Sequence, residues 1–115
     1  MLNPIATRLE HYMDLLSSRQ RLVAGNLANA DTPGYKTRDV DFNFEFMSAM
    51  NGAASPDPSI VEVSGLKVKQ DGNNVSVDRE ARLLAENAIR FALASNLMKA
   101  EIRQVRAAIQ EGRGG

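Results

Sequence analysis

The sequence contains no cysteine, no tryptophan, few aromatic residues and no excess of charge of either sign. The absence of cysteine excludes disulfides, cysteine-ligated zinc and a thiol nucleophile. The 14 basic and 14 acidic residues cancel, whereas a protein that binds nucleic acid without reading its sequence normally has a basic excess. With only four phenylalanines and two tyrosines, the 115-residue chain is expected to be held together by aliphatic helix packing and not by large aromatic anchors.

Long hydrophobic runs are also absent. Arg8, Glu10, Asp14, Arg19 and Arg21 interrupt the first 30 residues, so these lack the apolar stretch of a secretory leader. No other segment approaches the roughly 20 apolar residues that a membrane span requires. We therefore expect no cleaved signal peptide and no membrane span, and a chain of this length is expected to form one domain.

A helix is predicted near the start of the chain, from about Asn3 to Ala30. Its apolar residues recur at intervals of three and four, which places them on one helix face. Asn3 can cap the first turn, Pro4 suits the first helical position, and the Pro33-Gly34 pair ends the pattern. Residues 1–34 are therefore assigned to the first helical segment.

A second and longer helix is predicted from about Asp78 to Glu111, with Asp78 as its N-cap and Gly112 at its end. Its apolar positions alternate at steps of three and four over four heptads, which is the pattern of a left-handed coiled coil. At about 1.5 Å per residue this helix is about 50 Å long, too long for a compact sphere of 115 residues. We expect either a rod-shaped molecule or one that completes its packing against neighbours.

The two apolar faces predict a helix seam, which could be the core of one chain or a contact between chains. The residues assigned to this seam are Leu9, Tyr12, Leu16, Val23, Leu84, Phe91, Met98, Ile102 and Val105.

The middle of the chain, residues 35–77, has a different composition. Residues 36–42 partly alternate and can be extended, residues 42–50 have the spacing of a short helix, and residues 51–59 read as a flexible linker. Residues 60–69 alternate around Ser64-Gly65, which predicts a small hairpin within that segment. The predicted fold is mainly α, with the terminal segments 1–34 and 78–115 paired as an antiparallel coiled coil and a small irregular or β-hairpin middle.

Residues 26–35 form an unusual helix end. Asn26 and Asn29 are three residues apart and share a helix face, where their amides can satisfy the last carbonyls or the following turn. The segment is either a plain helix stop with a turn or a bend that contacts a neighbouring molecule. The residues assigned to the bend are Asn26, Asn29, Thr32, Pro33, Gly34 and Tyr35, followed by a polar rim of Arg38, Asp39 and Asp41.

Residues for chemistry are sparse. His11 is the only histidine, and it lies inside the first helix without a second histidine or a cysteine to share a metal. No Gly-x-Ser-x-Gly elbow and no Gly-Lys-Ser/Thr phosphate loop occur. We predict no catalytic, cofactor-binding or metal-binding residue, and we expect the protein not to be an enzyme.

The ten residues Asn-Leu-Ala-Asn-Ala-Asp-Thr-Pro-Gly-Tyr at 26–35 resemble the N-terminal signature of the flagellar axial family, which comprises rod, hook and hook–filament junction proteins. The continuation at 36–42 and the segment 71–80, which leads into the heptad helix, resemble the small rod proteins of that family. The resemblance covers residues 1–46 and 70–111.

This resemblance implies a structural subunit of the bacterial flagellar basal body, in the proximal part of the periplasmic rod. It implies export by the flagellar type III system and polymerisation through the terminal helices into part of the motor drive shaft. The implied partners are other copies of the chain, other rod proteins, and, at the rod base, the adapter FliE, the export gate and the MS ring. The alternatives are a helical adapter that does not polymerise and another small rod protein of the same family.

Overall fold

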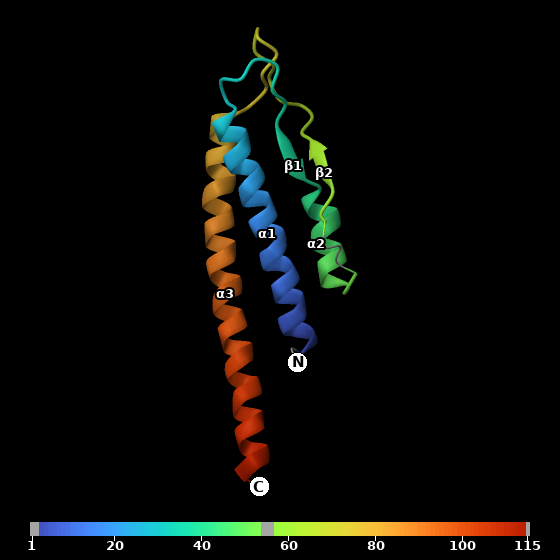
Figure 1. Cartoon of the computed structure of the whole chain (residues 1–115), viewed down its shortest axis with the longest axis vertical. Helices are drawn as coiled ribbons and strands as arrows, with labels where there is room; N and C mark the ends of the chain where they lie inside the picture. Colours follow the sequence, from blue (N-terminus) through green and yellow to red (C-terminus); the bar gives the residue numbers. More distant parts are fainter. Residues whose placement is uncertain (1–2, 54–56, 115) are drawn as a thin grey trace.

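The computed structural model describes residues 3–53 and 57–114 and is mainly helical (Figure 1). The elements in chain order are α1 (Pro4–Ala28), β1 (Arg38–Val40), α2 (Phe42–Met50), β2 (Ile60–Glu62) and α3 (Val77–Gly114). As predicted, two long terminal helices pack together and a small antiparallel sheet occupies the middle.

The molecule is elongated. It measures 71 × 24 × 16 Å and has a radius of gyration of 18.3 Å, whereas a compact protein of this length has about 13 Å. Its accessible surface is 7610 Å², about 1,400 Å² more than the roughly 6,200 Å² of a compact monomer of this mass. The single chain therefore leaves more surface uncovered than a globular fold would.

The helices α1 and α3 run antiparallel, and side-chain hydrogen bonds between them fix their register. Asn3 Nδ2 donates to Glu101 Oε2 at 2.9 Å near the start of α1, and Asn87 Nδ2 donates to the Leu16 carbonyl at 3.0 Å near its middle. α3 continues past the start of α1 (Figure 1). At about 1.5 Å per residue, residues 102–114 project about 20 Å beyond the level of Asn3.

The first helix begins as predicted, because the Asn3 side chain accepts a hydrogen bond from the Ala6 N–H at 2.8 Å and Pro4 is the first helical residue. The predicted cap of the second helix is wrong. Val77 already belongs to α3, and the Ser76 Oγ accepts from the Arg79 N–H at 3.2 Å. The predicted end is also early, because the helix continues through Gly112 to Gly114.

The sheet pairs segments that are far apart in sequence. β1 and β2 are antiparallel, with Arg38 opposite Glu62 and Val40 opposite Ile60. The hairpin predicted within residues 60–69 is therefore wrong. The chain after β2 turns at Gly65, which has φ +79°, and continues into a turn whose Lys69 N–H donates to the Asn73 carbonyl. The short helix predicted over residues 42–50 is present as α2, whereas part of the predicted linker 51–59, residues 54–56, lies outside the described residues.

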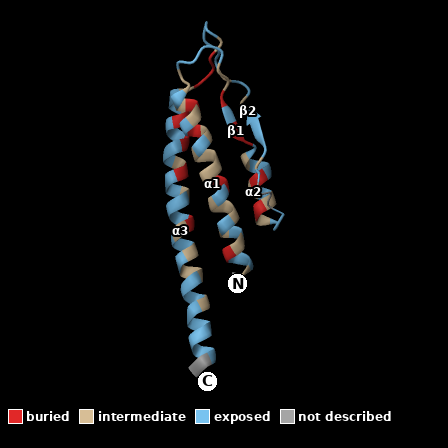
Figure 2. Ribbon diagram, viewed as in Figure 1, coloured by how far each residue is buried: buried red, intermediate tan, exposed pale blue. Residues whose placement is uncertain are grey.

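Buried residues lie along α1, in the half of α3 beside it, around β1, in α2 and in the turn that precedes α3 (Figure 2). The α3 residues that face α1 are Glu80, Leu83, Asn87 and Ala94, with exposed fractions of 0%, 7%, 3% and 2%. Two of the four are polar, which distinguishes this contact from an all-apolar heptad seam.

The row predicted to form the seam within the chain is turned away from its centre. Leu84 and Phe91 are each 39% exposed and Ile102 is 41% exposed, whereas Met98 and Val105 are half-buried. The predicted row lies one residue later than the observed row, and one residue rotates a helix by about 100°. The rotation follows from the polar residues of α3, whose hydrogen-bond partners lie on α1. On α1 the predicted seam residues are buried or half-buried: Leu9, Tyr12, Leu16 and Val23.

Candidate functional site

The side chain of Asn26, near the end of α1, is 1% exposed and uses all of its hydrogen-bonding capacity. Its Nδ2 donates to the Arg38 carbonyl at 2.8 Å and to Glu80 Oε1 at 2.5 Å. Its Oδ1 accepts from the Arg38 N–H and from the Tyr35 hydroxyl, both at 3.1 Å. An amide has two donors and two acceptor lone pairs, so this side chain is fully satisfied. Asn26 thus joins α1, the bend, β1 and α3 at one point.

A chain of ion pairs continues from this point. Arg79 donates to Glu80 Oε2 and to Asp39 Oδ2, each at 2.7 Å, and Arg19 makes a bidentate contact with the Asp39 carboxylate at 3.1 and 3.0 Å. Burial alone would disfavour the charged guanidinium of Arg79. Hydrogen bonds and Coulombic attraction from Glu80 and Asp39 outweigh it and raise the pKa of Arg79 above its ordinary value. The positive charges of two guanidinium groups therefore balance the negative charges of two carboxylates in a largely buried cluster.

We call Asn26, Arg19, Asp39, Arg79 and Glu80 the polar cluster. A buried carboxylate such as Glu80, which is 0% exposed, is tolerable only when it is paired. The cluster therefore fixes the approach of β1 to both long helices, because each member depends on partners from another element.

The bend itself is docked on the turn that precedes α3. The Gly34 N–H donates to the Asp71 carbonyl at 2.8 Å, and Asn73 Nδ2 donates to the Asn29 and Thr32 carbonyls, both at 2.9 Å. Gly34 has φ +76° and Gly72 has φ +86°. A Cβ on Gly72 would lie 3.3 Å from the Gly34 Cα, so a larger residue at this position would require the bend backbone to shift by a few tenths of an ångström.

Two further bonds attach the following residues to the same turn. The Thr37 N–H donates to Asn74 Oδ1 at 2.7 Å, and Thr37 Oγ1 donates to the Asn74 carbonyl at 3.3 Å. Thr37 is 0% and Asn73 is 0% exposed, so these polar side chains are part of the interior. The residues 26–37 and 71–80 thus form one continuous unit, although about 40 residues separate them in sequence.

The predicted bend residues are brought together, but they differ in exposure. Asn26 is buried, Asn29 and Tyr35 are half-buried, and the remaining ones are exposed: Thr32, Pro33 and Gly34. Asn29 Nδ2 donates back to the Gly25 carbonyl at 2.8 Å, so this side chain closes the last helical turn. The exposed tip leaves backbone and the Pro33 ring accessible to a neighbouring molecule.

The predicted polar rim is wrong for one of its three members. Arg38 and Asp41 are exposed, but Asp39 is only 5% exposed because its carboxylate is paired with two arginines. Sequence reasoning also missed Glu80 and Asn73 as structural residues. The available signal was that Arg19 and Asn26 occupy otherwise apolar positions of the first helix and therefore require polar partners.

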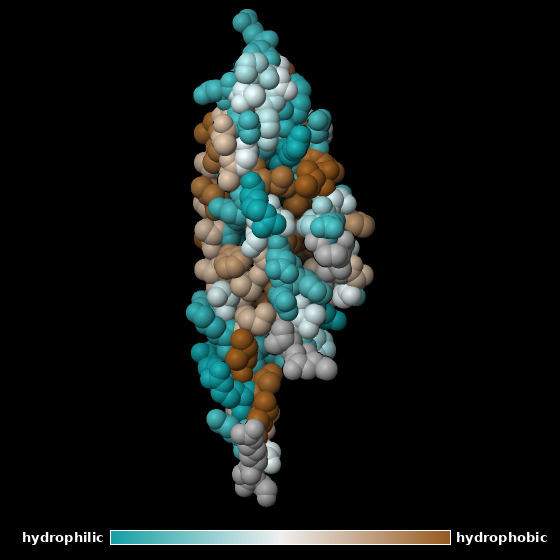
Figure 3. All heavy atoms as spheres, in the orientation of Figure 1, coloured by the Kyte–Doolittle hydropathy of each residue, from teal (hydrophilic) through white to brown (hydrophobic). Residues whose placement is uncertain are grey.

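Large apolar side chains remain exposed, most of them on α3. Figure 3 shows hydrophobic side chains at the surface along α3 and near the sheet. On α3 the exposed large apolar residues are Val77, Leu84, Ile89, Phe91, Leu93, Leu97, Ile102 and Ile109.

Two surface depressions adjoin α3. One, of about 580 Å³, lies beside the polar cluster between β2, the start of α2 and α3, where the Arg19 and Arg90 guanidinium groups lie 4.6 and 5.6 Å from the centre of the Phe42 ring. The other, of about 500 Å³, lies between α1 and α3 and is mostly apolar. Among the described residues, no group of three or more potential metal ligands is assembled, and none of the described helices is both long and apolar enough to cross a membrane.

Comparison with known proteins shows that the segment containing the bend is similar to a family of flagellar proteins. The family model described as "Flagella basal body rod protein" matches residues 13–36, which comprise the second half of α1 and the bend. The flagellar basal body rod protein FlgB of Escherichia coli K12 is 29% identical over 122 aligned residues, covering 87% of this chain and 88% of the relative. The proteins of the same name from Borrelia hermsii and Yersinia ruckeri are 29% and 26% identical, covering 86% and 87% of this chain and 90% and 89% of the relatives.

The chain is similar to flagellar basal body rod proteins over most of its length.

The matched segment includes two of the elements that Asn26 joins, the end of α1 and the bend. Asn26 and Tyr35 lie inside the matched segment, and their partner Glu80 lies in the part of α3 that the alignment to the full-length rod proteins spans. In this chain, the residues of the matched segment therefore fix the angle between the first helix and the chain that follows it. The chain is mainly helical, and the relatives that it resembles are named as flagellar basal body rod proteins.

Proposed function

We propose that this protein is a subunit of the proximal rod of the flagellar basal body and that it polymerises through its terminal helices. The observation that carries the proposal is the exposed apolar surface of α3. Between residues 84 and 97 this helix exposes the large apolar side chains of Leu84, Ile89, Phe91, Leu93 and Leu97, and extensive exposed apolar surface marks a site of interaction with another molecule. In a rod, neighbouring subunits cover this surface.

The amount of uncovered surface agrees with contacts to more than one neighbour. The surface of the chain exceeds that of a compact monomer by about 1,400 Å², and a standard interface buries about 800 Å² on each partner. A contact that propagates along a rod requires two different surfaces on each subunit. The projecting segment 102–114 of α3 offers one such surface beyond the end of α1.

The finer proposal concerns location and partners. The subunit lies in the periplasmic part of the basal body, is exported unfolded by the flagellar type III system, and contacts FliE, the export gate or the MS ring below and other rod proteins above. The absence of cysteine supports this route, because no disulfide has to be reduced before passage through a channel.

Sedimentation velocity of the purified chain tests polymerisation directly. The sedimentation coefficient is expected to rise with protein concentration as elongated multimers form, and the addition of neighbouring rod proteins should shift assembly to lower concentration. A coefficient that stays at the monomer value over the whole range, with a single partner bound at a fixed ratio, identifies the non-polymerising adapter instead.

A charged substitution tests the same surface in cells. Ile102→Asp places a charge on the projecting part of α3, where the side chain is 41% exposed and contributes little to the fold. We expect normal synthesis, no incorporation into the rod and loss of motility on soft agar. Gln104→Asp, two residues along on the same exposed helix, is the matched control and should swim normally. Normal motility of the Ile102→Asp strain contradicts the proposal.

A further inference from the structure

The apolar depression between α1 and α3 has the form of a groove for a third helix. Ser17 and Gln20 of α1 form one wall, and Ala88, Phe91 and Ala92 of α3 form the other, enclosing about 500 Å³. Small residues on both walls leave room for large side chains to enter from outside. We call this depression the helix-pair groove.

A row of large side chains stands on the other side of the same helix. Ile89, Leu93 and Leu97 are spaced by four residues and are 70%, 60% and 49% exposed. At about 100° per residue, Leu93 lies about 140° around the helix from Ala88 in the groove. We call these three residues the outer row. Each chain therefore has the apolar helix-pair groove on one side of α3 and the protruding apolar side chains of the outer row on the other.

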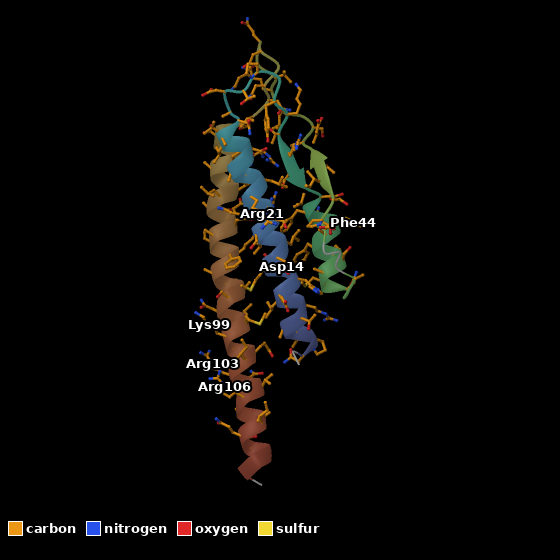
Figure 4. The ribbon with its side chains drawn as sticks, viewed as in Figure 1. Asp14, Arg21, Phe44, Lys99, Arg103 and Arg106 are labelled. Carbon is orange, nitrogen blue, oxygen red and sulfur yellow. The ribbon has the colours of Figure 1, made fainter. Side chains whose placement is uncertain are left out.

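Charges accompany both surfaces. Arg21 lies at the edge of the groove, and among the described residues its guanidinium donates a hydrogen bond only to the Ser18 hydroxyl, at 3.2 Å. Arg21 lies on α1 (Figure 4), where it also borders a depression formed with Val40, Pro58 and Ile60. Glu86 lies three residues before the outer row and takes part in none of the ion pairs of the described chain. One unpaired positive and one unpaired negative group thus flank complementary surfaces.

Arg21 and Glu86 lie at nearly the same position along the long axis of the molecule. The hydrogen bonds of Asn26 to Glu80 and of Asn87 to Gln20 show which parts of the antiparallel helices lie at the same level. By interpolation, Arg21 lies within about two residues of the level of Glu86, or about 3 Å along the axis. Two parallel copies placed side by side without axial displacement would bring these charges together.

We propose that the helix-pair groove binds α3 of a second copy of this chain, with the outer row of the second copy in the groove and its Glu86 paired with Arg21. The copies lie parallel and side by side. This inference rests on the proposed function and specifies which surfaces meet. The groove and the outer row are different surfaces of one chain, so the contact is heterologous. A heterologous contact leaves one free groove and one free outer row at the ends of each assembly, so further copies can be added.

Engineered cysteines test the contact, because the natural sequence has none. Ala88→Cys places a thiol in the groove and Ile89→Cys places one in the outer row, at nearly the same level along the axis. Adjacent residues of a helix point about 100° apart, so the two thiols cannot form a disulfide within one chain, whereas they differ by only about 1.5 Å in level between two copies without axial displacement. Under mild oxidation, the chain carrying both substitutions should give a ladder of cross-linked multimers on a denaturing gel.

The single-cysteine chains are the controls. Each alone should remain monomeric on the gel, and an equimolar mixture of the two should give dimers and nothing larger. A ladder or strong dimer from one single-cysteine chain would indicate a symmetric contact and overturn the inference. Sedimenting multimers without a ladder would also overturn it but leave polymerisation in place. If no multimers sediment, both the inference and the proposed function fail.

Charge reversal provides a second readout in the double-cysteine chain. Arg21→Glu and Glu86→Arg should each lower the yield of cross-linked multimers about tenfold, and the two together should restore it. Lys67→Glu, which reverses an exposed charge in the chain between β2 and α3, is the matched control and should leave the yield unchanged. Failure of the double reversal to restore the yield would overturn the Arg21–Glu86 pairing.

Discussion

Replacement of Asn26 by alanine tests the central role of the polar cluster. The substitution removes four hydrogen bonds at once and shortens a side chain that is 1% exposed. Glu80 loses one of its two side-chain partners while its carboxylate stays buried. Arg38 loses a partner for both its N–H and its carbonyl, and the Tyr35 hydroxyl loses its acceptor.

The expected cost follows from the burial of the groups left behind. A buried polar group without a partner costs about 1–3 kcal/mol, and more when it is charged. Glu80, at 0% exposure, accounts for about 2 kcal/mol, whereas water can reach the half-buried groups of Arg38 and Tyr35 and limits their share to about 1 kcal/mol. The free energy of unfolding should therefore fall by about 3 kcal/mol, a large part of the stability of a small domain.

Urea unfolding followed by helical circular dichroism measures this change. With a denaturant slope of about 2 kcal/mol per molar, the midpoint should fall by about 1.5 M, at protein concentrations low enough to keep the chain monomeric. Asn96→Ala, at an exposed position of α3, is the matched control and should change stability by no more than about 0.5 kcal/mol.

The comparison with Asn29→Ala decides whether the reasoning holds. Asn29 has two side-chain hydrogen bonds, to the Gly25 carbonyl and to the exposed Thr32 hydroxyl, so its replacement should cost about 1 kcal/mol and lower the midpoint by about 0.5 M. Equal midpoints for the Asn26 and Asn29 variants would refute the argument, because they would show that the buried cluster contributes no more than a helix end.

Three further substitutions give distinct outcomes. Gly72→Ala combines a φ of +86° with a Cβ only 3.3 Å from the bend backbone, and thermal unfolding should show a loss of about 2 kcal/mol. Arg79→Met leaves a buried carboxylate without its guanidinium and should lower the urea midpoint by an amount that corresponds to about 3–5 kcal/mol. Asn29→Ala should reduce rod assembly, scored by motility, more than His11→Ala; equal effects would identify the bend as a plain helix stop.

Much of the architecture could be predicted from local patterns. The cap at Asn3, the stop at Pro33-Gly34 and the apolar periodicity predict two long helices, and their length implies an elongated molecule. The ten residues from Asn26 to Tyr35 were sufficient to indicate the family. These features follow from φ restrictions, capping and helix periodicity, which act over a few residues and are therefore visible in the sequence.

The tertiary structure alone decided which faces meet. Periodicity places apolar residues on one side of α3, but the rotation of the helix depends on Glu80, Asn87 and their partners across the interface. An unpaired buried polar group costs more than partial exposure of Leu84 or Phe91, so the helix turns to satisfy the polar groups and leaves apolar surface uncovered. The pairing of β1 with β2 was likewise undetermined by sequence, because strand partners are selected by the space and hydrogen bonds that the docked bend leaves available.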